Sequence, residues 1–181
     1  LTIAAAGNAM DNGAELCTNF EVISIEKGDA YYTLNAADGR SVQARFVVNS
    51  AGLFSDAIAA MVGDTSFHVH PRSGEYMILD KASAGFCDRT IFRTPTAMGK
   101  GILVSPTADG NILLGPTSTD MTDKTDKSTT PEGLAKIMTQ ALEDAPGVPL
   151  RSVITSFTGL RAVGDTGDFI IHFSADRFLT L

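Results

Sequence analysis

Short hydrophobic runs alternate with turn-forming residues along the chain, and the clearest local pattern follows the apolar run 46–48. The small residues Ala51 and Gly52 come next, and Ser55 or Asp56 can cap a helix there. This pattern predicts a strand, a tight turn and a helix. Such a turn lets a large ligand approach the backbone, and the free N–H groups of the helix favour an anion. An ordinary strand-to-helix junction, packed tightly for its own sake, gives the same pattern.

The residues before this turn predict a three-stranded β-meander. Polar and apolar residues alternate on both sides of a turn at 27–29, and Asp38-Gly39 is a strong two-residue hairpin signal. At the start of the chain, apolar residues recur at helical spacing until Asn12-Gly13, which predicts a helix. The meander strands are predicted at 20–26, 30–34 and 41–49, with a short strand at 15–18 before them.

The rest of the chain predicts further strands and one long helix. Thr130 can cap this helix, Pro131 suits its first turn, and apolar residues recur at helical spacing until Pro146 ends it. We expect its apolar stripe to face a core, with a partner-binding face as the alternative. The polar segment 118–130 predicts a solvated loop. The other predicted elements are a helix at 55–62 and strands at 67–70, 75–79, 90–93, 101–105, 112–114, 152–160, 169–173 and 176–181, with a turn at 71–74.

Composition and charge narrow the functional classes. The 181 residues are 44% hydrophobic, which suits a folded protein with a sizeable core. The net charge of −7 and the scattered positions of the 14 Lys and Arg residues argue against nucleic-acid binding. Cys17 and Cys87 have no CxxC motif or His cluster beside them, so we predict reduced core thiols and no metal site.

No apolar run approaches the length needed to cross a bilayer, and no basic amphipathic helix is visible. We therefore expect a cytoplasmic protein and leave peripheral contact with a membrane open. Leu1 lies inside the first predicted helix, and Leu181 ends the last predicted strand without a terminating residue. We therefore expect that the chain belongs to a longer protein.

Four sequence blocks, in order, carry a family resemblance. They are FVVNSAGLFSD at 46–56, HPRSGEY at 70–76, GNILLGPT at 110–117 and FTGLR at 157–161. Together they resemble the FAD-dependent oxidoreductases of the D-amino-acid oxidase superfamily. The chain is most similar to the glycerol-3-phosphate dehydrogenase-like branch, with the L-2-hydroxyglutarate oxidase branch close behind.

The resemblance implies FAD as the cofactor of the whole protein. In such enzymes the meander sets a backbone N–H and C=O against the adenine, so Val22 is the candidate residue there. The small residues Ser50, Ala51 and Gly52 would lie close to the nucleotide part of the flavin. The resemblance also implies a partial FAD-binding domain at 1–65, a substrate-binding domain at 66–165 whose sheet faces the flavin, and return strands at 166–181. We therefore predict an α+β protein, with a mixed or antiparallel sheet and flanking helices in the substrate-binding domain.

One feature of the family is missing from this sequence. The G-x-G-x-x-G dinucleotide fingerprint is absent, and the turn at Gly99-Lys100-Gly101 cannot replace it. We therefore expect that the fingerprint precedes Leu1 and that the final flavin-contacting segment follows Leu181. By itself, the chain is expected neither to hold FAD tightly nor to turn over substrate.

The resemblance places an arginine, here Arg161, in the substrate pocket. Its planar fork of donors suits a carboxylate or a phosphate, and it would steady negative charge during hydride transfer. From the sequence alone, a surface ion pair is an equally ordinary role. Many relatives have a proline after this arginine, whereas this chain has Ala162, which leaves the rigidity of the segment in question.

Further candidates lie at the entry to the substrate-domain sheet. Arg72, Glu75 and Tyr76 are candidate substrate-binding residues, although alternation in a half-exposed strand explains Glu75 and Tyr76 equally well. His70 is a candidate base that takes a proton from a substrate hydroxyl, or else a structural histidine. We leave His68 and His172 out of the site because neither has a neighbouring carboxylate or Cys at the spacing of a known motif.

These residues predict an enzyme that moves a hydride from a small anionic hydroxy substrate, similar to glycerol 3-phosphate, to FAD. The expected partners are that substrate, the flavin and the remainder of the FAD-binding domain, with no nucleic acid. Two alternatives stay open. One is an oxidase of the same superfamily that acts on a 2-hydroxy acid or an amino acid, and the other is a non-catalytic binding module that reuses the substrate-domain scaffold.

Overall fold

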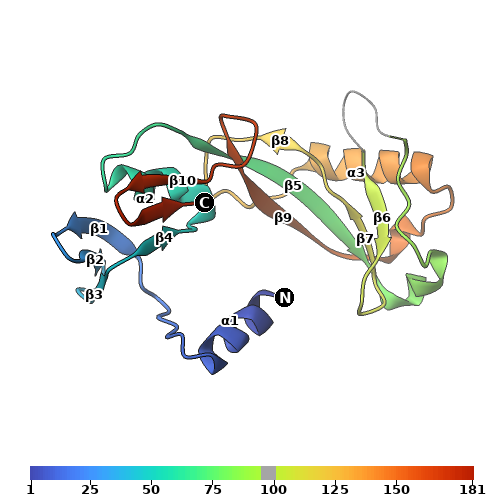
Figure 1. Cartoon of the computed structure of the whole chain (residues 1–181). Coiled ribbons are helices and arrows are strands. Elements are labelled where there is room, and N and C mark those ends of the chain that lie inside the picture. The colour runs from blue at the N-terminus through green and yellow to red at the C-terminus, as the bar shows by residue number, and fades with distance from the viewer. Residues whose placement is uncertain (95–100) are drawn as a thin grey trace. The chain divides into compact units, whose positions relative to one another are not determined.

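The computed structural model describes residues 1–94 and 101–181, so Gly99 and Lys100 of the expected turn lie outside the described residues. The chain divides into two compact units, and each is described by itself. Unit 1 comprises residues 1–66 and 170–181, and unit 2 comprises residues 67–169. The predicted α+β class, with antiparallel and mixed sheets, is confirmed (Figure 1).

Unit 1 begins with the predicted helix and meander. Helix α1 (Thr2–Asp11) ends at Asn12 and buries none of its residues. Strands β1 (Val22–Lys27), β2 (Tyr32–Ala36) and β3 (Ser41–Ala44) form an antiparallel sheet with the predicted hairpin at Asp38-Gly39. The short strand expected at 15–18 is wrong, because this segment is irregular and exposed.

The strand expected at 41–49 is in fact two strands in different sheets. β3 pairs with β2, whereas β4 (Val47–Asn49) pairs in parallel with β11 (Phe178–Thr180). β11 also forms a hairpin with β10 (His172–Ala175), which turns at Arg177. The chain therefore changes partners at Phe46, which is 69% exposed. The 3₁₀ turn η1 (Gly52–Phe54) and helix α2 (Ser55–Ala60) follow β4.

The core of unit 1 joins its two sheets. Ile25, Tyr32, Val47 and Phe178 form one buried cluster, and the rings of Tyr32 and Phe178 meet edge to face at 5.5 Å. The Tyr32 hydroxyl donates a hydrogen bond to the backbone carbonyl of Asp176. Burial raises the pKa of Tyr32, so this hydroxyl stays a donor.

Unit 2 is organised around one long strand. β5 (Val69–Leu79) pairs along its whole length with β9 (Val153–Gly164), and on its other edge with β7 and β8. The turn expected at 71–74 is therefore wrong, because β9 and β8 hold these residues extended. The remaining elements are η2 (Lys81–Phe86), β6 (Leu103–Pro106), β7 (Ile112–Gly115), β8 (Thr119–Asp120), α3 (Pro131–Asp144) and η3 (Leu150–Ser152).

Helix α3 forms where its sequence predicts it. Thr130 Oγ1 accepts a hydrogen bond from the backbone N–H of Gly133, and Pro131 occupies the first turn. Ile137 and Ala141 of its stripe are buried in one cluster with Met77 and Leu79 of β5. The core-facing interpretation of the stripe is confirmed for these two residues.

The β6–β7 hairpin completes the sheet of unit 2, as predicted, but two neighbouring expectations change. Only an isolated bridge between Ile91 and Val104 stands where the strand 90–93 was expected, among the described residues. The loop expected at 118–130 contains the short strand β8. Gly115 has a φ of +132°, and a Cβ there would lie 2.8 Å from the Glu75 carbonyl oxygen, so a larger residue would not fit.

Candidate active site

The β5–β9 pair presents two different faces. Arg72 lies directly opposite Arg161, and Tyr76 lies directly opposite Phe157. Directly opposite residues share one side of a sheet, and alternate residues of a strand do too. We call the side that carries His70, Arg72, Tyr76, Phe157 and Arg161 the open face, because its residues are half-buried or exposed. Four of the five residues predicted for substrate binding or catalysis therefore lie on one surface.

The two arginines of the open face differ in their ion pairing. Arg72 Nε donates a hydrogen bond to Asp120 Oδ1, and this pairing lowers the pKa of Asp120 and raises that of Arg72. His70 Nε2 lies 3.6 Å from the same carboxylate oxygen. Arg161 is exposed and makes no ion pair with any described residue. Of the two arginines on the open face, Arg161 is therefore the one whose guanidinium has no ion-pair partner in the described part of the chain.

Two aromatic rings flank these charges. Tyr76 and Phe157 stack with their centroids 5.0 Å apart and their planes at 11°. Tyr76 is half-buried and Phe157 is exposed, so the stacked pair places apolar ring surface beside the arginines along the same strands. Such a surface excludes water from one side of a bound molecule.

Arg161 lies inside a strand and not in a loop. Its neighbour Ala162 pairs with Pro71, and pairing continues on both sides of it. The absence of proline after Arg161 therefore does not free the backbone, because the β5 ladder holds it.

Glu75 is the exception among the predicted substrate residues. It lies on the opposite side of the β5–β9 pair, a two-stranded ribbon. We call this side the covered face, and it also carries Ser73, Met77, Leu79 and Thr158. Glu75 is 4% exposed, and its Oε1 accepts hydrogen bonds from the backbone N–H and the hydroxyl of Thr130. Its other carboxylate oxygen lies 3.3 Å from Thr117 Oγ1.

The Glu75 carboxylate thus holds the N-terminus of α3 against the sheet. A Cβ at Gly133 would lie 1.3 Å from Glu75 Oε2, which shows how closely the first helical turn sits on this group. A carboxylate near a helix N-terminus is favoured by the helix dipole. We therefore leave Glu75 out of the proposed substrate site.

The predicted cofactor-side turn follows β4 in unit 1. Ser50 and Ala51 are exposed, and Gly52 has a φ of +58° with open space where a Cβ would stand. The Ser55 hydroxyl is buried and has no hydrogen-bond partner in the described part of the chain. Bare backbone and unused hydrogen-bonding capacity at one turn fit a large polar cofactor.

Two details of this turn differ from expectation. Neither Ser55 nor Asp56 caps α2 with its side chain, and Asp56 Oδ1 instead accepts a hydrogen bond from the N–H of Ala57. Helix α2 has only six residues, so it offers a weak site for an anion. What a ligand meets here is the exposed turn and not a helix end.

Val22, the candidate for the adenine side, lies at the start of β1. Its side chain is half-buried against the unit 1 core, and the pairing of β1 with β2 shifts register between Val22 and Ser24. The side chain is thus engaged in packing, which leaves the backbone groups as the candidate contacts.

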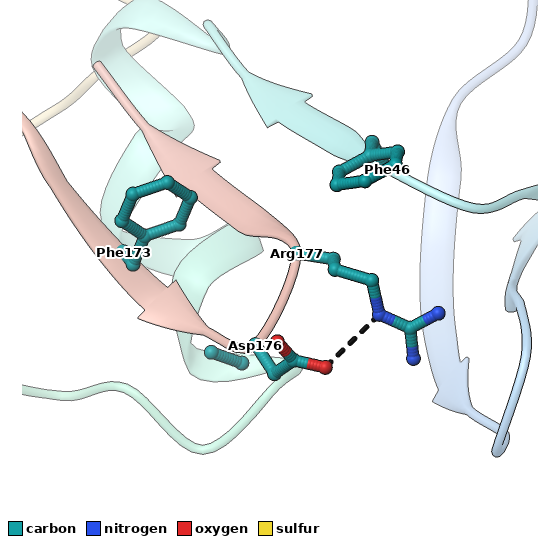
Figure 2. A pocket seen from close by; sticks show the side chains of 5 residues that line it. Phe46, Phe173, Asp176 and Arg177 are labelled. Atoms are coloured by element: carbon teal, nitrogen blue, oxygen red, sulfur yellow. Dashed lines mark hydrogen bonds and ion pairs between the residues drawn. The ribbon is translucent and has the colours of Figure 1, made fainter.

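Unit 1 also contains an open hollow lined by Phe46, Phe173, Ala175, Asp176 and Arg177. Figure 2 shows Arg177 Nε bonded to the Asp176 carboxylate, and the two terminal nitrogens of the same guanidinium donate to the carbonyls of Ala30 and Asp29. Phe46 and Phe173 are 69% and 70% exposed. The hollow therefore offers apolar surface, because its one cation is already engaged.

The structure brings together residues that sequence reasoning missed. His172 Nε2 lies 2.7 Å from Asp64 Oδ2, although 108 positions separate the two residues. Hydrogen bonds from Ser174 and then from His172 are the main causes that lower the pKa of Asp64. Asp120 sits in the polar segment taken as a loop, and Asn49 lies inside the strand-to-turn block itself. Only Asn49 carried a local signal, as a polar residue that ends an apolar strand.

Other expectations concern metals, membranes and thiols. The described residues contain no cluster of His, Cys, Asp or Glu that could hold a metal ion, and no described helix has the length and apolarity of a membrane span. Cys17 and Cys87 form no disulfide. The prediction of a core thiol is wrong for Cys17, which is exposed, while Cys87 is half-buried and burial raises its pKa.

Comparison with known proteins assigns the family. Residues 1–180 match the family described as FAD dependent oxidoreductase, and the chain belongs to this family. It is 41% identical over 175 residues to a glycerol 3-phosphate dehydrogenase of Caloramator mitchellensis. The aligned region covers 97% of this chain and 36% of that protein. It is also 30% identical over 125 residues to the mitochondrial L-2-hydroxyglutarate dehydrogenase of Bos taurus. That aligned region covers 61% of this chain and 27% of the relative.

A solved structure gives the same assignment. The FAD-bound L-α-glycerophosphate oxidase of Mycoplasma pneumoniae superposes with a TM-score of 0.85 at 27% identity, over 97% of this chain and 48% of that one. The chain thus spans between about a third and a half of the length of these glycerophosphate enzymes. The resemblance inferred from the four sequence blocks is confirmed, with the glycerophosphate enzymes ahead of the hydroxyglutarate enzymes.

Proposed function

We propose that a whole protein containing this chain is an FAD-dependent oxidoreductase that oxidises a small anionic hydroxy substrate such as glycerol 3-phosphate. The names of the glycerophosphate relatives support this substrate class. FAD would supply the redox chemistry when bound, by accepting a hydride from the carbon that bears the hydroxyl. The residues of this chain would bind and orient the substrate, exclude water and take up its proton.

The observation that carries the proposal is the unengaged guanidinium of Arg161 on the open face, beside the Tyr76–Phe157 stack. A guanidinium presents paired donors that match the oxygens of a phosphate or a carboxylate. Arg72, directly opposite, adds positive potential but shares its charge with Asp120. We therefore assign the substrate anion to Arg161 first and to Arg72 second.

His70 is the proposed proton acceptor. It lies two residues before Arg72 on the same face, and the nearby Asp120 carboxylate can orient its ring. Its distance from Arg72 along β5 is that of alternate strand residues, and Arg161 lies directly opposite Arg72, which suits a substrate of only a few carbon atoms.

We further propose that unit 1 is part of an FAD-binding domain and unit 2 a substrate-binding domain. Val22 and residues 50–52 would contact the cofactor from unit 1. Among the described residues β4 pairs on one edge only, with β11, and its central residue Val48 is 59% exposed. An open strand edge and exposed apolar groups, including Phe46 and Phe173, support docking of the remainder of the FAD-binding domain there.

The experiment is substrate profiling of the whole protein. Anaerobic bleaching of the bound-flavin absorbance is followed with glycerol 3-phosphate, a 2-hydroxy acid and an amino acid. Rapid bleaching by glycerol 3-phosphate alone is expected. A colourless protein that binds no flavin would contradict the cofactor assignment. The chain by itself, residues 1–181, is expected to purify without a flavin spectrum.

A 2-hydroxy acid is the second candidate substrate, because the chain is also similar to L-2-hydroxyglutarate dehydrogenase. The same arginine fork would then hold a carboxylate. Preferential bleaching by the hydroxy acid would favour this candidate. For the compartment we retain the prediction of a cytoplasmic protein.

A further inference from the structure

A buried asparagine holds the cofactor-side turn from within. Asn49 ends β4 and is only 3% exposed. Its Oδ1 accepts a hydrogen bond from the backbone N–H of Ala51 at 3.2 Å, and its Nδ2 donates to the carbonyl of Ser55 at 2.8 Å. One side chain therefore spans the turn from Ala51 to the first residue of α2.

This asparagine is itself the end of a chain of polar side chains, buried at Asn49 and Thr180 and half-buried at Ser174 and Asp64. Asn49 Nδ2 lies 3.3 Å from Thr180 Oγ1 on β11, and that hydroxyl lies 2.7 Å from Ser174 Oγ on β10. Ser174 in turn hydrogen-bonds to the Asp64 carboxylate. Asp64 also pairs with His172. Four strand or loop segments of unit 1 thus meet behind the turn.

The direction of the chain follows from its acidic end. An ionised carboxylate can only accept hydrogen bonds, so Ser174 donates to Asp64 and has its oxygen left to accept from Thr180. The Thr180 oxygen then accepts from Asn49 Nδ2. This order turns the amide nitrogen of Asn49 toward Thr180 and Ser55, and it leaves Oδ1 for the N–H of Ala51.

We propose that Asn49 is a positioning residue that fixes the backbone of the turn 50–52 for the cofactor, and that the polar chain from Thr180 to Asp64 fixes the orientation of its amide. The inference rests on the proposed function, because it takes this turn as a contact with FAD. A turn that already has its bound shape binds a ligand more tightly, because binding then carries no entropy cost for ordering the turn.

The test uses the whole protein and two readouts, amide hydrogen exchange of Ala51 without FAD and the dissociation constant of FAD. In Asn49→Ala the Ala51 amide loses its acceptor, so its exchange should become about tenfold faster and FAD binding about tenfold weaker. The matched control is Asn35→Ala on β2. Asn35 also donates from Nδ2 to two side-chain oxygens, but at the exposed surface of the meander, and neither readout should change.

Thr180→Val provides a second test that does not depend on the fold of Asn49→Ala. It keeps the shape of the buried side chain and removes the hydroxyl that joins Asn49 to Ser174, so both readouts should shift in the same direction by about threefold. If Asn49→Ala does not fold, Thr180→Val decides the question.

The failures can be told apart. If the unaltered protein binds no FAD, the proposed function fails. If the unaltered protein binds FAD, and Asn49→Ala or its substitute Thr180→Val leaves either readout equal to the Asn35→Ala control, the positioning role of Asn49 is overturned while the proposed function stands.

Discussion

The two faces of the β5–β9 ribbon are built from alternate residues of the same strands, yet they have opposite surroundings. On the covered face, Met77 and Leu79 pack against α3, and Glu75 receives hydrogen bonds from Thr130. On the open face, Arg72 and Arg161 stand opposite each other in contact with solvent. Unpaired charge is expensive inside a protein and inexpensive at its surface. The fold therefore depends on the packing of the covered face, and the open face carries charged groups in contact with solvent.

The largest expected effect is a difference in the free energy of unfolding between substitutions on the two faces. Leu79→Ala removes a fully buried side chain and should lower the free energy of unfolding by about 2–5 kcal/mol. Ile78→Ala, one residue earlier on the open face, is the matched control and should cost about 1 kcal/mol or less. Urea denaturation measures both. Equal losses would show that the open face also belongs to a core.

A smaller loss is expected at Glu75. Glu75→Ala leaves the Thr130 N–H and two hydroxyl groups without their acceptor, which should lower the free energy of unfolding by about 1–3 kcal/mol. The control Glu132→Ala, also in the first turn of α3 but exposed, loses only a favourable interaction with the helix dipole, about 0.3–1 kcal/mol.

Glu75→Ala should also leave the preference of the whole enzyme for anionic over neutral substrates unchanged. A higher KM for the anionic substrate, in a variant as stable as the unaltered protein, would return Glu75 to the binding site.

The smallest stability effect is expected at Asp120. Because Arg72 and His70 hold its pKa below the ordinary value of about 3.9, the Asp120 charge favours the folded state above that pH. This contribution disappears as the pH falls below about 4 through the folded-state pKa. The stability difference between Asp120→Asn and the unaltered protein should therefore be small at pH 7 and vanish in acid, as acid and urea titrations would show.

Asp120→Asn should have a clearer effect on binding. It releases Arg72 from its carboxylate partner, so KM for an anionic substrate should fall severalfold. A rise in KM would mean that Asp120 orients Arg72 for the substrate and does not compete with it.

The elements that could be predicted from sequence are those with local signals. Thr130 and Pro131 mark the start of α3, and Asp38-Gly39 marks the first hairpin, because capping and turn geometry depend on adjacent residues. The family resemblance then located the open-face residues Arg72 and Arg161, although not their direct opposition.

The parts that could not be predicted depend on pairing between distant segments. The sequence at 71–74 has turn chemistry, but β9 holds it extended from more than 80 positions away. Asp64 and His172 meet for the same reason, and so do Arg72 and Asp120. The side of the strand on which Glu75 lies was also beyond prediction. Alternation places Glu75 and Tyr76 on opposite faces, but it does not show which of them faces the helix.

The most direct test of the central claim compares two substrates in Arg161 variants of the whole protein. If Arg161 binds the substrate anion, Arg161→Ala should lower kcat/KM for glycerol 3-phosphate by roughly 100- to 1,000-fold, in the range for the loss of a charged contact, and barely change the slow oxidation of uncharged glycerol. Arg161→Lys should recover part of the loss. An equal loss with both substrates would contradict the claim, because it would show that Arg161 does not act through the anionic group.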